Sequence, residues 1–208
     1  MYNVISDIAG QYKTLQALLA KMPPGVPVSV GDMVDRGPDS DKVIDFFRTT
    51  PGALAVLGNH EHMLLDQGAY DYGIWEYNGG SATLRSYGGK VPDEVKMWLW
   101  RLPLHLKLGK FLVSHAFLRP GQSILKSTQV AASLDSREVE RYVWYRGDPV
   151  PRKGIVQICG HNSPMGLKHF RKARARFDYA VCLDDSHKRK LTGMHLPTME
   201  IFQQDYID

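Results

Sequence analysis

Apolar and polar positions alternate along the first 60 residues in a pattern of short strands and amphipathic helices. Leu15, Leu18 and Leu19 fall on one face of a predicted helix, which Pro23 and Pro24 close. Strands that alternate with helices in this way predict a largely parallel sheet. The predicted strands cover residues 2–6, 26–30 and 53–57, and the predicted helices cover residues 11–21 and the stretch from Pro38 and Asp39 onwards.

The pattern changes after residue 60. Residues 63–101 are typical of less regular helices, among them an amphipathic helix over 91–101, and we expect this segment to cap the sheet or overhang a site. From residue 104 the chain returns to apolar strands, the first two joined by Gly109-Lys110 as a two-residue hairpin. We interpret residues 121–137 as a candidate lid. The predicted strands here cover residues 104–108, 111–114, 155–159, 179–183, 191–196 and 198–202.

Size and composition favour a soluble enzyme-sized domain. The chain has 208 residues, of which 43% are hydrophobic and 23% charged, so we expect one domain over 1–208 that includes the helical cap segment. No apolar run approaches the roughly 20 residues of a membrane helix, and no secretion leader is visible. Cys159 and Cys182 lie in apolar runs, as reduced core cysteines do. We therefore expect a cytoplasmic monomer without membrane contact.

The positive charge is concentrated late in the chain. The net charge of +4 is mild, and much of it falls between residues 168 and 190. A nucleic-acid surface is one interpretation, but Phe170 and Phe177 are the only aromatic residues within the basic run at 168–177. We favour a solvated basic face that attracts anionic substrates, and do not expect nucleic-acid binding. The basic residues are Lys168, Arg171, Lys172, Arg174, Arg176, Lys188, Arg189 and Lys190.

Polar side chains that can bind metals follow the predicted strands. A single strand-end histidine or a salt-bridged Asp and Arg in a turn would have a purely structural explanation. Right-handed crossovers, however, bring the ends of successive parallel strands to the same edge of a sheet, so we expect the N-terminal groups to converge. The residues are Asp7 after the first strand, Asp32 and Asp35 after the second, Asn59 and His60 after the third, and His115 and His161 after two later strands.

The set Asp7, Asp32, Asn59, His115 and His161 combines carboxylate, amide and imidazole donors. Such donors suit Mn²⁺, Fe²⁺ or Zn²⁺, and the absence of thiolates argues against a structural zinc site. A carboxylate such as Asp32 can bridge two ions. Paired ions about 3.5–4 Å apart can deprotonate a water and clamp a phosphoryl group for in-line attack.

The same chemistry needs a cation for the developing charge and a proton for the leaving group. Arg36 offers a forked donor beside the predicted site. His60 follows a metal-type residue, and Asp35 could orient it and raise its pKa.

Five short motifs in this order resemble those of the calcineurin-like metallophosphoesterases, and within them the small bacterial and bacteriophage serine/threonine phosphatases. The resemblance covers nearly the whole chain, because segments such as Trp144-Tyr145-Arg146 are also similar. It implies a central β-sandwich of mixed sheets, built from βαβ units and flanked by helices. The motifs are Asp7-Ile8-Ala9-Gly10, Gly31-Asp32-Met33-Val34-Asp35-Arg36-Gly37, Gly58-Asn59-His60-Glu61, His115-Ala116 and Gly160-His161.

The resemblance also implies roles. Asp7 and Asp32 would hold a first metal ion, and Asp32, Asn59, His115 and His161 a second, with Mn²⁺ favoured over Fe or Zn. His60, oriented by Asp35, would be the general acid, and Arg36 and Arg146 would bind the phosphate together with Asn59 and His60. Metal-bound hydroxide would attack phosphorus directly, without a phosphoenzyme. The substrate would be a phosphorylated protein or a small phosphoester.

Ala9 departs from the family pattern, which has a metal-binding histidine at this position. We therefore expect the first ion to be weakly held or absent, and activity to be impaired. Two interpretations stay open, an introduced substitution that silences the enzyme and a natural variant. The intact remainder of the motifs favours the former.

Leu57 is the second departure, because many family phosphatases have a phosphate-binding arginine before Gly58. This feature is similar to the symmetrical diadenosine tetraphosphate hydrolases, so a nucleotide phosphohydrolase is the alternative to a serine/threonine phosphatase. A second alternative is an inactive protein that binds phosphate or a phosphopeptide.

Overall fold

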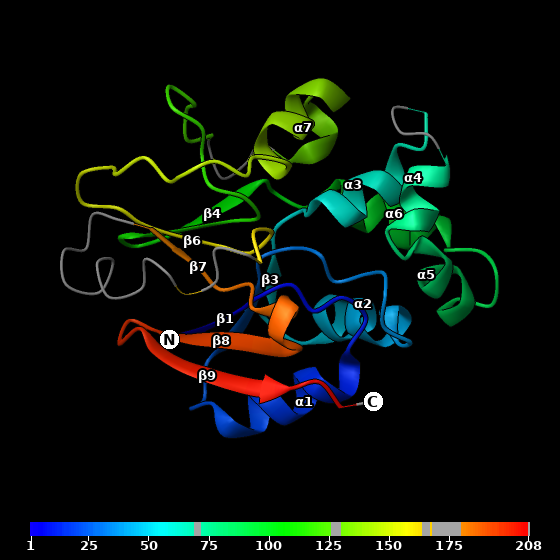
Figure 1. Cartoon of the computed structure of the whole chain (residues 1–208), viewed down its shortest axis with the longest axis horizontal. Helices are drawn as coiled ribbons and strands as arrows, with labels where there is room; N and C mark the ends of the chain where they lie inside the picture. The colour runs from blue at the N-terminus through cyan, green and yellow to red at the C-terminus, as the bar shows by residue number, and fades with distance from the viewer. Residues whose placement is uncertain (69–71, 126–129, 164–166, 168–179, 208) are drawn as a thin grey trace.

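Two β-sheets stacked face to face form the centre of the molecule (Figure 1). The computed structural model describes residues 1–68, 72–125, 130–163, 167 and 180–207. The first sheet has the strand order β3-β2-β1-β8-β9 and the second β4-β5-β6-β7. The first comprises β1 (Tyr2–Ile5), β2 (Val26–Ser29), β3 (Leu54–Ala55), β8 (Lys190–Leu196) and β9 (Glu200–Asp205).

The first sheet begins with parallel strands, as the alternating pattern predicted. β1 pairs in parallel with β2 and β2 with β3, through the crossover helices α1 (Tyr12–Lys21) and α2 (Ser40–Thr49). β8 then pairs antiparallel with β1, and β9 antiparallel with β8. The carboxyl ends of β1, β2 and β3 therefore share one edge.

The second sheet is also mixed. β4 and β5 form the predicted antiparallel hairpin, whereas β5, β6 and β7 run parallel. Cys159 in β6 pairs with Cys182 in β7. This register places the segment after Cys159, which contains His161, beside the segment after Cys182, which contains Asp184. The strands are β4 (His105–Leu108), β5 (Phe111–Ser114), β6 (Val156–Cys159) and β7 (Ala180–Cys182).

Apolar side chains fill the space between the sheets and the space beneath the helices. Val4 and Val28 of the first sheet share a fully buried cluster with Val113 and Ile158 of the second. A second cluster contains Leu15 and its neighbours under the helices. A β-sandwich of mixed sheets flanked by helices is thus confirmed.

The cap segment consists of short helices, at the right of Figure 1. Its members pack on one another, α3 against α4 and α6, and α5 against α4, and α5 also packs on the crossover helix α2. The helix α7 also packs on α3. The bounds are α3 (Asn59–Leu65), α4 (Tyr72–Tyr77), α5 (Gly80–Ser86), α6 (Asp93–Trp100) and α7 (Ser136–Val143).

The structure corrects several predicted boundaries. β3 has only two residues, because the chain turns into α3 at Asn59, where a strand-end loop was predicted. The last strand begins at Glu200 and not at residue 198. Helix α7 was not predicted. It begins within the candidate lid at Ser136, where the Asp135 side chain accepts the Glu138 N–H as an N-cap.

Some predictions fall outside the described residues. These are residues 168–179 of the basic run, residue 179 of the seventh strand and residues 126–129 of the candidate lid. In the described part of the basic run, Lys188 pairs with Asp185 and Lys190 with Asp205. Among the described residues, no helix has the length and apolar character needed to cross a membrane.

Candidate metal and phosphate site

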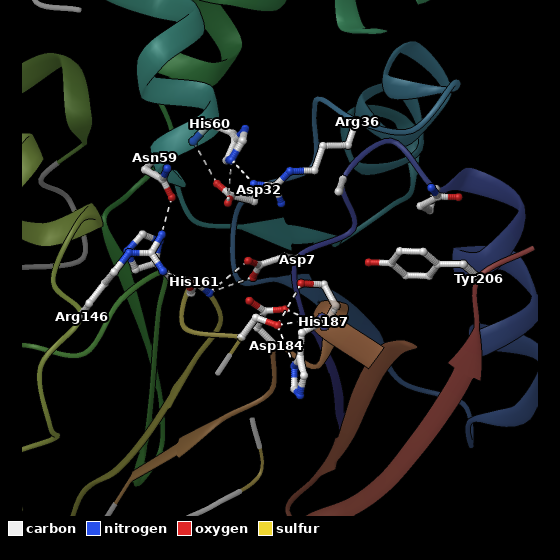
Figure 2. A pocket seen from close by; sticks show the side chains of 14 residues that line it. Asp7, Asp32, Arg36, Asn59, His60, Arg146, His161, Asp184, His187 and Tyr206 are labelled. Carbon is white, nitrogen blue, oxygen red and sulfur yellow. Dashed lines mark hydrogen bonds and ion pairs between the residues drawn. The ribbon is translucent and has the colours of Figure 1, made fainter. Parts of the chain in front are cut away.

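A cavity of about 450 Å³ opens where the ends of the parallel strands meet (Figure 2). Seven of the nine residues predicted for the site line it, from segments far apart in the sequence. Asp35 and His115 lie directly behind the lining, fully buried. The lining residues are Asp7, Ala9, Gln11, Asp32, Arg36, Asn59, His60, Arg146, His161, Ser163, Asp184, Ser186, His187 and Tyr206.

One side of the cavity, which we call the histidine side, consists of Asp32, Asn59, His115 and His161. The Asn59 Oδ1 atom lies 2.7 Å from His115 Nε2 and 2.8 Å from His161 Nδ1. Donor atoms of Asp32, His115 and His161 all lie within 4.8 Å of one another. Four metal-type side chains thus converge on one point.

The protonation of the histidine side favours metal binding. His115 Nδ1 donates to the Val30 carbonyl (2.9 Å), so in the neutral ring Nε2 keeps its lone pair toward the cavity. Burial lowers the pKa of His115, and burial together with His115 and Arg146 lowers the pKa of His161 to about 2. Burial would raise the pKa of Asp32, but His115 and His60 outweigh it and bring it to about 2. The ligand forms, neutral imidazole and charged carboxylate, are therefore the stable ones.

Glu61 holds the Asp32 loop against the start of α3. Its carboxylate accepts the N–H groups of Gly58, Asp32, Met33 and Val34, at 2.7 to 3.2 Å. Burial and the nearby Asp32 raise the pKa of Glu61 to about 7, against these hydrogen bonds. Glu61 thus caps the helix and fixes Asp32 at the same time.

His60 belongs to a buried chain of hydrogen bonds. Its Nδ1 lies 2.6 Å from Asp35 Oδ2, and Arg36 Nη2 donates to its Nε2 (2.8 Å). A guanidinium can only donate, so the ring proton is on Nδ1, facing Asp35. Burial lowers the pKa of His60, but Asp32 and Asp35 outweigh it, so the pKa is raised.

Asp35 is held in turn by the cap helices. Trp75 Nε1 donates to both oxygens of Asp35, at 3.0 and 3.2 Å, and Thr83 Oγ1 donates at 2.6 Å. The Asp35 N–H also donates to Thr83 and Ser40. The motifs of the sequence did not reveal Trp75 or Thr83, because they meet Asp35 only through the docking of α4 and α5. Ser40, at the start of α2, was also not predicted as a partner.

Arg36 and Arg146 approach the cavity from different elements (Figure 2). The Arg36 backbone is in the left-handed region, at φ 63°, and its N–H donates to the Gly79 carbonyl. Arg146 Nη1 donates to the His161 carbonyl (3.0 Å). Leu57, by contrast, is fully buried in the core and contributes nothing to the site.

The opposite side of the cavity, which we call the acidic side, consists of Asp7, Ala9 and Asp184. Asp7 accepts the His161 N–H at 3.0 Å. Burial raises the pKa of Asp7 well above its usual range, and the charges of Asp184 and Asp32 raise it further. Ala9 is 4% exposed, lines the cavity at φ 49° and offers no donor atom. Left-handed backbone at a residue other than glycine is typical of functional loops.

Two glycines leave room for the ligands. A Cβ atom on Gly160 would lie 1.8 Å from Asp7 Oδ1, and one on Gly58 would lie 2.3 Å from Asp32 Oδ1. Both contacts are shorter than any real Cβ contact, so these positions accept only glycine. The carboxylates can therefore lie directly against the backbone of neighbouring loops.

The residues present fit a divalent metal centre. Carboxylate, amide and neutral imidazole donors suit borderline or hard divalent ions. Within the described residues, the buried His161 Nε2 has no hydrogen-bond partner, and neither Asp7 nor Asp184 has an ion pair. Asp32, Asn59, His115 and His161 could hold one ion, and Asp7 with Asp32 could contribute to a second.

The chain matches the profile of the family described as calcineurin-like phosphoesterase over residues 2–184. Among curated proteins, it is similar to the symmetrical bis(5'-nucleosyl)-tetraphosphatase of Coxiella burnetii (strain Dugway 5J108-111). The two are 32% identical over 143 residues, which are 63% of this chain and 48% of the relative. The enzyme of the same name from Dechloromonas aromatica (strain RCB) is 34% identical over 170 residues, 78% of this chain and 56% of the relative. The chain thus matches about half the length of these relatives.

Solved structures share the fold. One described as a diadenosine tetraphosphatase has a TM-score of 0.67 at 23% identity, covering 100% of this chain and 94% of that one. A protein serine/threonine phosphatase from Saccharomyces cerevisiae has a TM-score of 0.63 at 14% identity, covering 100% and 80%. These likenesses support the metallophosphatase fold.

Proposed function

The chain belongs to the calcineurin-like phosphoesterase family, and on that premise we propose that it hydrolyses dinucleoside polyphosphates in a metal-dependent reaction. The observation that carries the proposal is the convergence of metal-type donors, two arginines and a buried histidine in one cavity. The substrate class rests on the similarity to symmetrical bis(5'-nucleosyl)-tetraphosphatases. Symmetrical cleavage of a dinucleoside tetraphosphate would give two nucleoside diphosphates.

Arg36 and Arg146 are the phosphate-binding groups of this proposal. Both guanidiniums reach the cavity, one from the loop after β2 and one from the segment after α7. Planar forked donors match phosphate oxygens and stabilise the charge that develops on them. A chain of several phosphates needs more than one such group, and the two arginines reach the cavity from separate segments.

His60 is the proton donor to the leaving oxygen. Attack of water on an inner phosphorus breaks the bond between that phosphorus and the bridging oxygen. The leaving diphosphate takes a proton from Nε2 of the doubly protonated His60 ring, whose pKa is raised, and the attacking water releases its own proton to solvent. Asp35 stabilises the charged ring through Nδ1. In the structure Arg36 occupies Nε2, so substrate phosphate must draw Arg36 away before His60 can act.

The metal centre would be held by the histidine side and by Asp7. A divalent ion there would supply Lewis-acid activation of water and of the phosphoryl group. The neutral state of His115 and His161 prepares them as ligands. The donor set fits Mn²⁺, Fe²⁺ or Zn²⁺, and we propose Mn²⁺ as the ion to test first.

The test compares three substrates with Mn²⁺ present: diadenosine tetraphosphate, a phosphoserine peptide and p-nitrophenyl phosphate. We expect the dinucleotide to have the highest kcat/KM and ADP to be its only nucleotide product. A higher kcat/KM for the phosphopeptide would favour the serine/threonine phosphatase interpretation. Tight binding of a phospho-ligand without turnover of any substrate would favour a binding protein and refute the proposal.

A further inference from the structure

Tyr206 is held at the edge of the cavity by contacts with two different elements. It follows β9, lines the cavity, and packs part of its ring on the apolar core. Its N–H donates to the Arg189 carbonyl (2.9 Å), and the Arg189 guanidinium lies 5.9 Å from the centre of its ring. The next residue, Ile207, donates its N–H to Thr14 Oγ1 of α1 at 2.9 Å. The position of the ring is therefore set both by the residue before β8 and by α1.

The Tyr206 hydroxyl points into the cavity, toward the side that carries Asp7 (Figure 2). Within the described residues this hydroxyl makes no hydrogen bond. The serine hydroxyls that line the cavity are already engaged, because Ser186 Oγ donates to Ser163 Oγ (3.2 Å), which lies 2.9 Å from His187 Nδ1. Of the hydroxyls that line the described part of the cavity, that of Tyr206 is therefore the one left to bind a ligand.

Tyr206 and Arg146 lie at opposite ends of the cavity in Figure 2, with Asp7 and Asp32 between them. A ligand that contacts both ends must be longer than a single phosphate group. Burial, together with Asp184 and Asp7, raises the pKa of Tyr206 to about 12, so the hydroxyl keeps its proton at neutral pH and can donate a hydrogen bond. The cavity thus has a guanidinium donor at one end and an uncharged O–H donor at the other.

We propose that Tyr206 donates its O–H to a phosphate oxygen of a dinucleoside polyphosphate, on a phosphate group other than the one attacked, and thereby favours substrates with several phosphates over phosphomonoesters. The proposal deepens the function proposed above and rests on it. A hydrogen bond to a charged group changes affinity by about 10- to 100-fold. The single phosphate of a monoester, bound at Arg36 and His60, would leave the Tyr206 hydroxyl without this partner.

The test compares Tyr206→Phe with the unsubstituted protein in the presence of Mn²⁺. The substitution keeps the ring and its contact with Arg189 and removes only the hydroxyl. We expect kcat/KM to fall about 10- to 100-fold with diadenosine tetraphosphate and much less with p-nitrophenyl phosphate. An equal fall with both substrates would overturn the proposal, because it would mean that Tyr206 supports the metal centre and not the additional phosphates.

Tyr12→Phe is the matched control. Tyr12 is the first residue of α1, is also partly buried against the core, and does not line the cavity. This variant should keep both kcat/KM values. Thermal melting checks that the fold of both variants is intact, and we expect the Tm of the unsubstituted protein in each.

A binding measurement separates this proposal from the proposed function. Isothermal titration calorimetry at a fixed concentration of free Mn²⁺ gives the Kd of inorganic tripolyphosphate and of orthophosphate. We expect Tyr206→Phe to raise the Kd of tripolyphosphate about 10-fold or more and to change that of orthophosphate much less.

Three results of this pair of measurements differ in meaning. An equal Kd of tripolyphosphate in both proteins, or no binding of it, would overturn the proposal. If the activity with diadenosine tetraphosphate nevertheless fell in Tyr206→Phe, the hydroxyl would contact the nucleoside and not the phosphates. If the unsubstituted protein binds tripolyphosphate but does not hydrolyse diadenosine tetraphosphate, the proposed function fails, and the Kd values alone decide the role of Tyr206.

Discussion

The two sides of the cavity differ in their donor groups: the histidine side clusters neutral donors around the charged Asp32, and the acidic side brings two carboxyl groups together. On the histidine side, Asn59, His115 and His161 contact one another within 3.2 Å, and the charged Asp32 carboxylate accepts the His60 backbone N–H. On the acidic side, Asp7 and Asp184 lie close enough to repel each other, and Ala9 adds no donor. The donor atoms of the histidine side are already close together, whereas the charged form of Asp7 on the acidic side is disfavoured until an ion arrives.

This difference implies an order of loading. An ion should bind first where neutral ligands are already assembled, because little rearrangement or proton release is needed there. The acidic side is less ready to bind, since burial and like charge raise the pKa of Asp7 and so disfavour its charged form. The four changes below test this contrast, in order of expected effect.

Loss of a histidine-side ligand should have the largest effect. His161→Ala removes a neutral donor from the ion that loads first, so we expect metal content to fall below one per chain and kcat to drop about a thousandfold or more, the equivalent of several kcal/mol. Metal analysis and a Mn²⁺-dependent assay measure this. His187→Ala, which also lines the cavity, is the control and should keep its metal. Full metal content in His161→Ala would contradict the assignment of the histidine side.

Loss of the proton donor should have the next largest effect, without touching the metal. His60→Asn should lower kcat by about 10²- to 10⁴-fold with an alkyl phosphoester such as phosphoserine, because the alkoxide needs a proton. The loss should be much smaller with p-nitrophenyl phosphate, whose leaving group is stable as an anion. An equal loss with both substrates would show that His60 positions phosphate and does not donate a proton.

Asp7→Asn should separate the two sides most clearly, because its effects on stability and metal binding have opposite signs. The metal-free protein should become more stable by about 1–3 kcal/mol, since asparagine replaces a carboxyl group whose charged form is disfavoured by burial and by the nearby Asp184. For a chain of this length that corresponds to a rise in Tm of several degrees. The rise in Tm on addition of Mn²⁺ should be smaller than in the unsubstituted protein. Thermal melting in EDTA and in Mn²⁺ measures both, and a lower Tm in EDTA would contradict the contrast.

Trp75→Phe should have the smallest effect of the four. It removes the indole donor to Asp35 and should cost about 1–2 kcal/mol of stability, with metal content unchanged on both sides of the cavity. Denaturant unfolding and metal analysis measure this. The control is Trp98→Phe, because the Trp98 indole makes no hydrogen bond in the described part of the chain. A loss of metal in Trp75→Phe would mean that the cap helices also organise the metal ligands.

Local sequence patterns predicted the parts of the molecule that depend on short-range order. The strand ends placed Asp7, Asp32 and Asn59 at one edge, because parallel topology leaves no other arrangement. Local patterns did not predict the length of β3 or the start of α3, because both depend on a contact with another loop. The Glu61 carboxylate accepts N–H groups of Gly58 and of the Asp32 loop, and this favours a helix directly after a two-residue strand.

The sequence did not predict the residues that hold Asp35 in place, because these contacts form only when the helices pack against one another. Thr83 lies 48 positions from Asp35, and no local motif marks the contact. Asp184 directly follows the strand predicted over 179–183, but no motif marked it for the site, since its position in the cavity follows from the pairing of β7 with β6. Helix α7, by contrast, carried local signals that the prediction of a lid over 121–137 overlooked: the cap residue Asp135 and the helical spacing of its buried residues Val139, Tyr142 and Val143.

The close packing of Gly58 and Gly160 against Asp32 and Asp7 has an evolutionary consequence. Every amino-acid change that a single base substitution can make in a glycine codon adds a Cβ atom, and at these two positions that atom would occupy the space of a carboxylate oxygen. Substitutions at Gly58 and Gly160 therefore cannot shift the two carboxylates by small steps. Tolerated changes around the metal centre should instead fall at neighbouring positions with room for a side chain, of which position 9 is one.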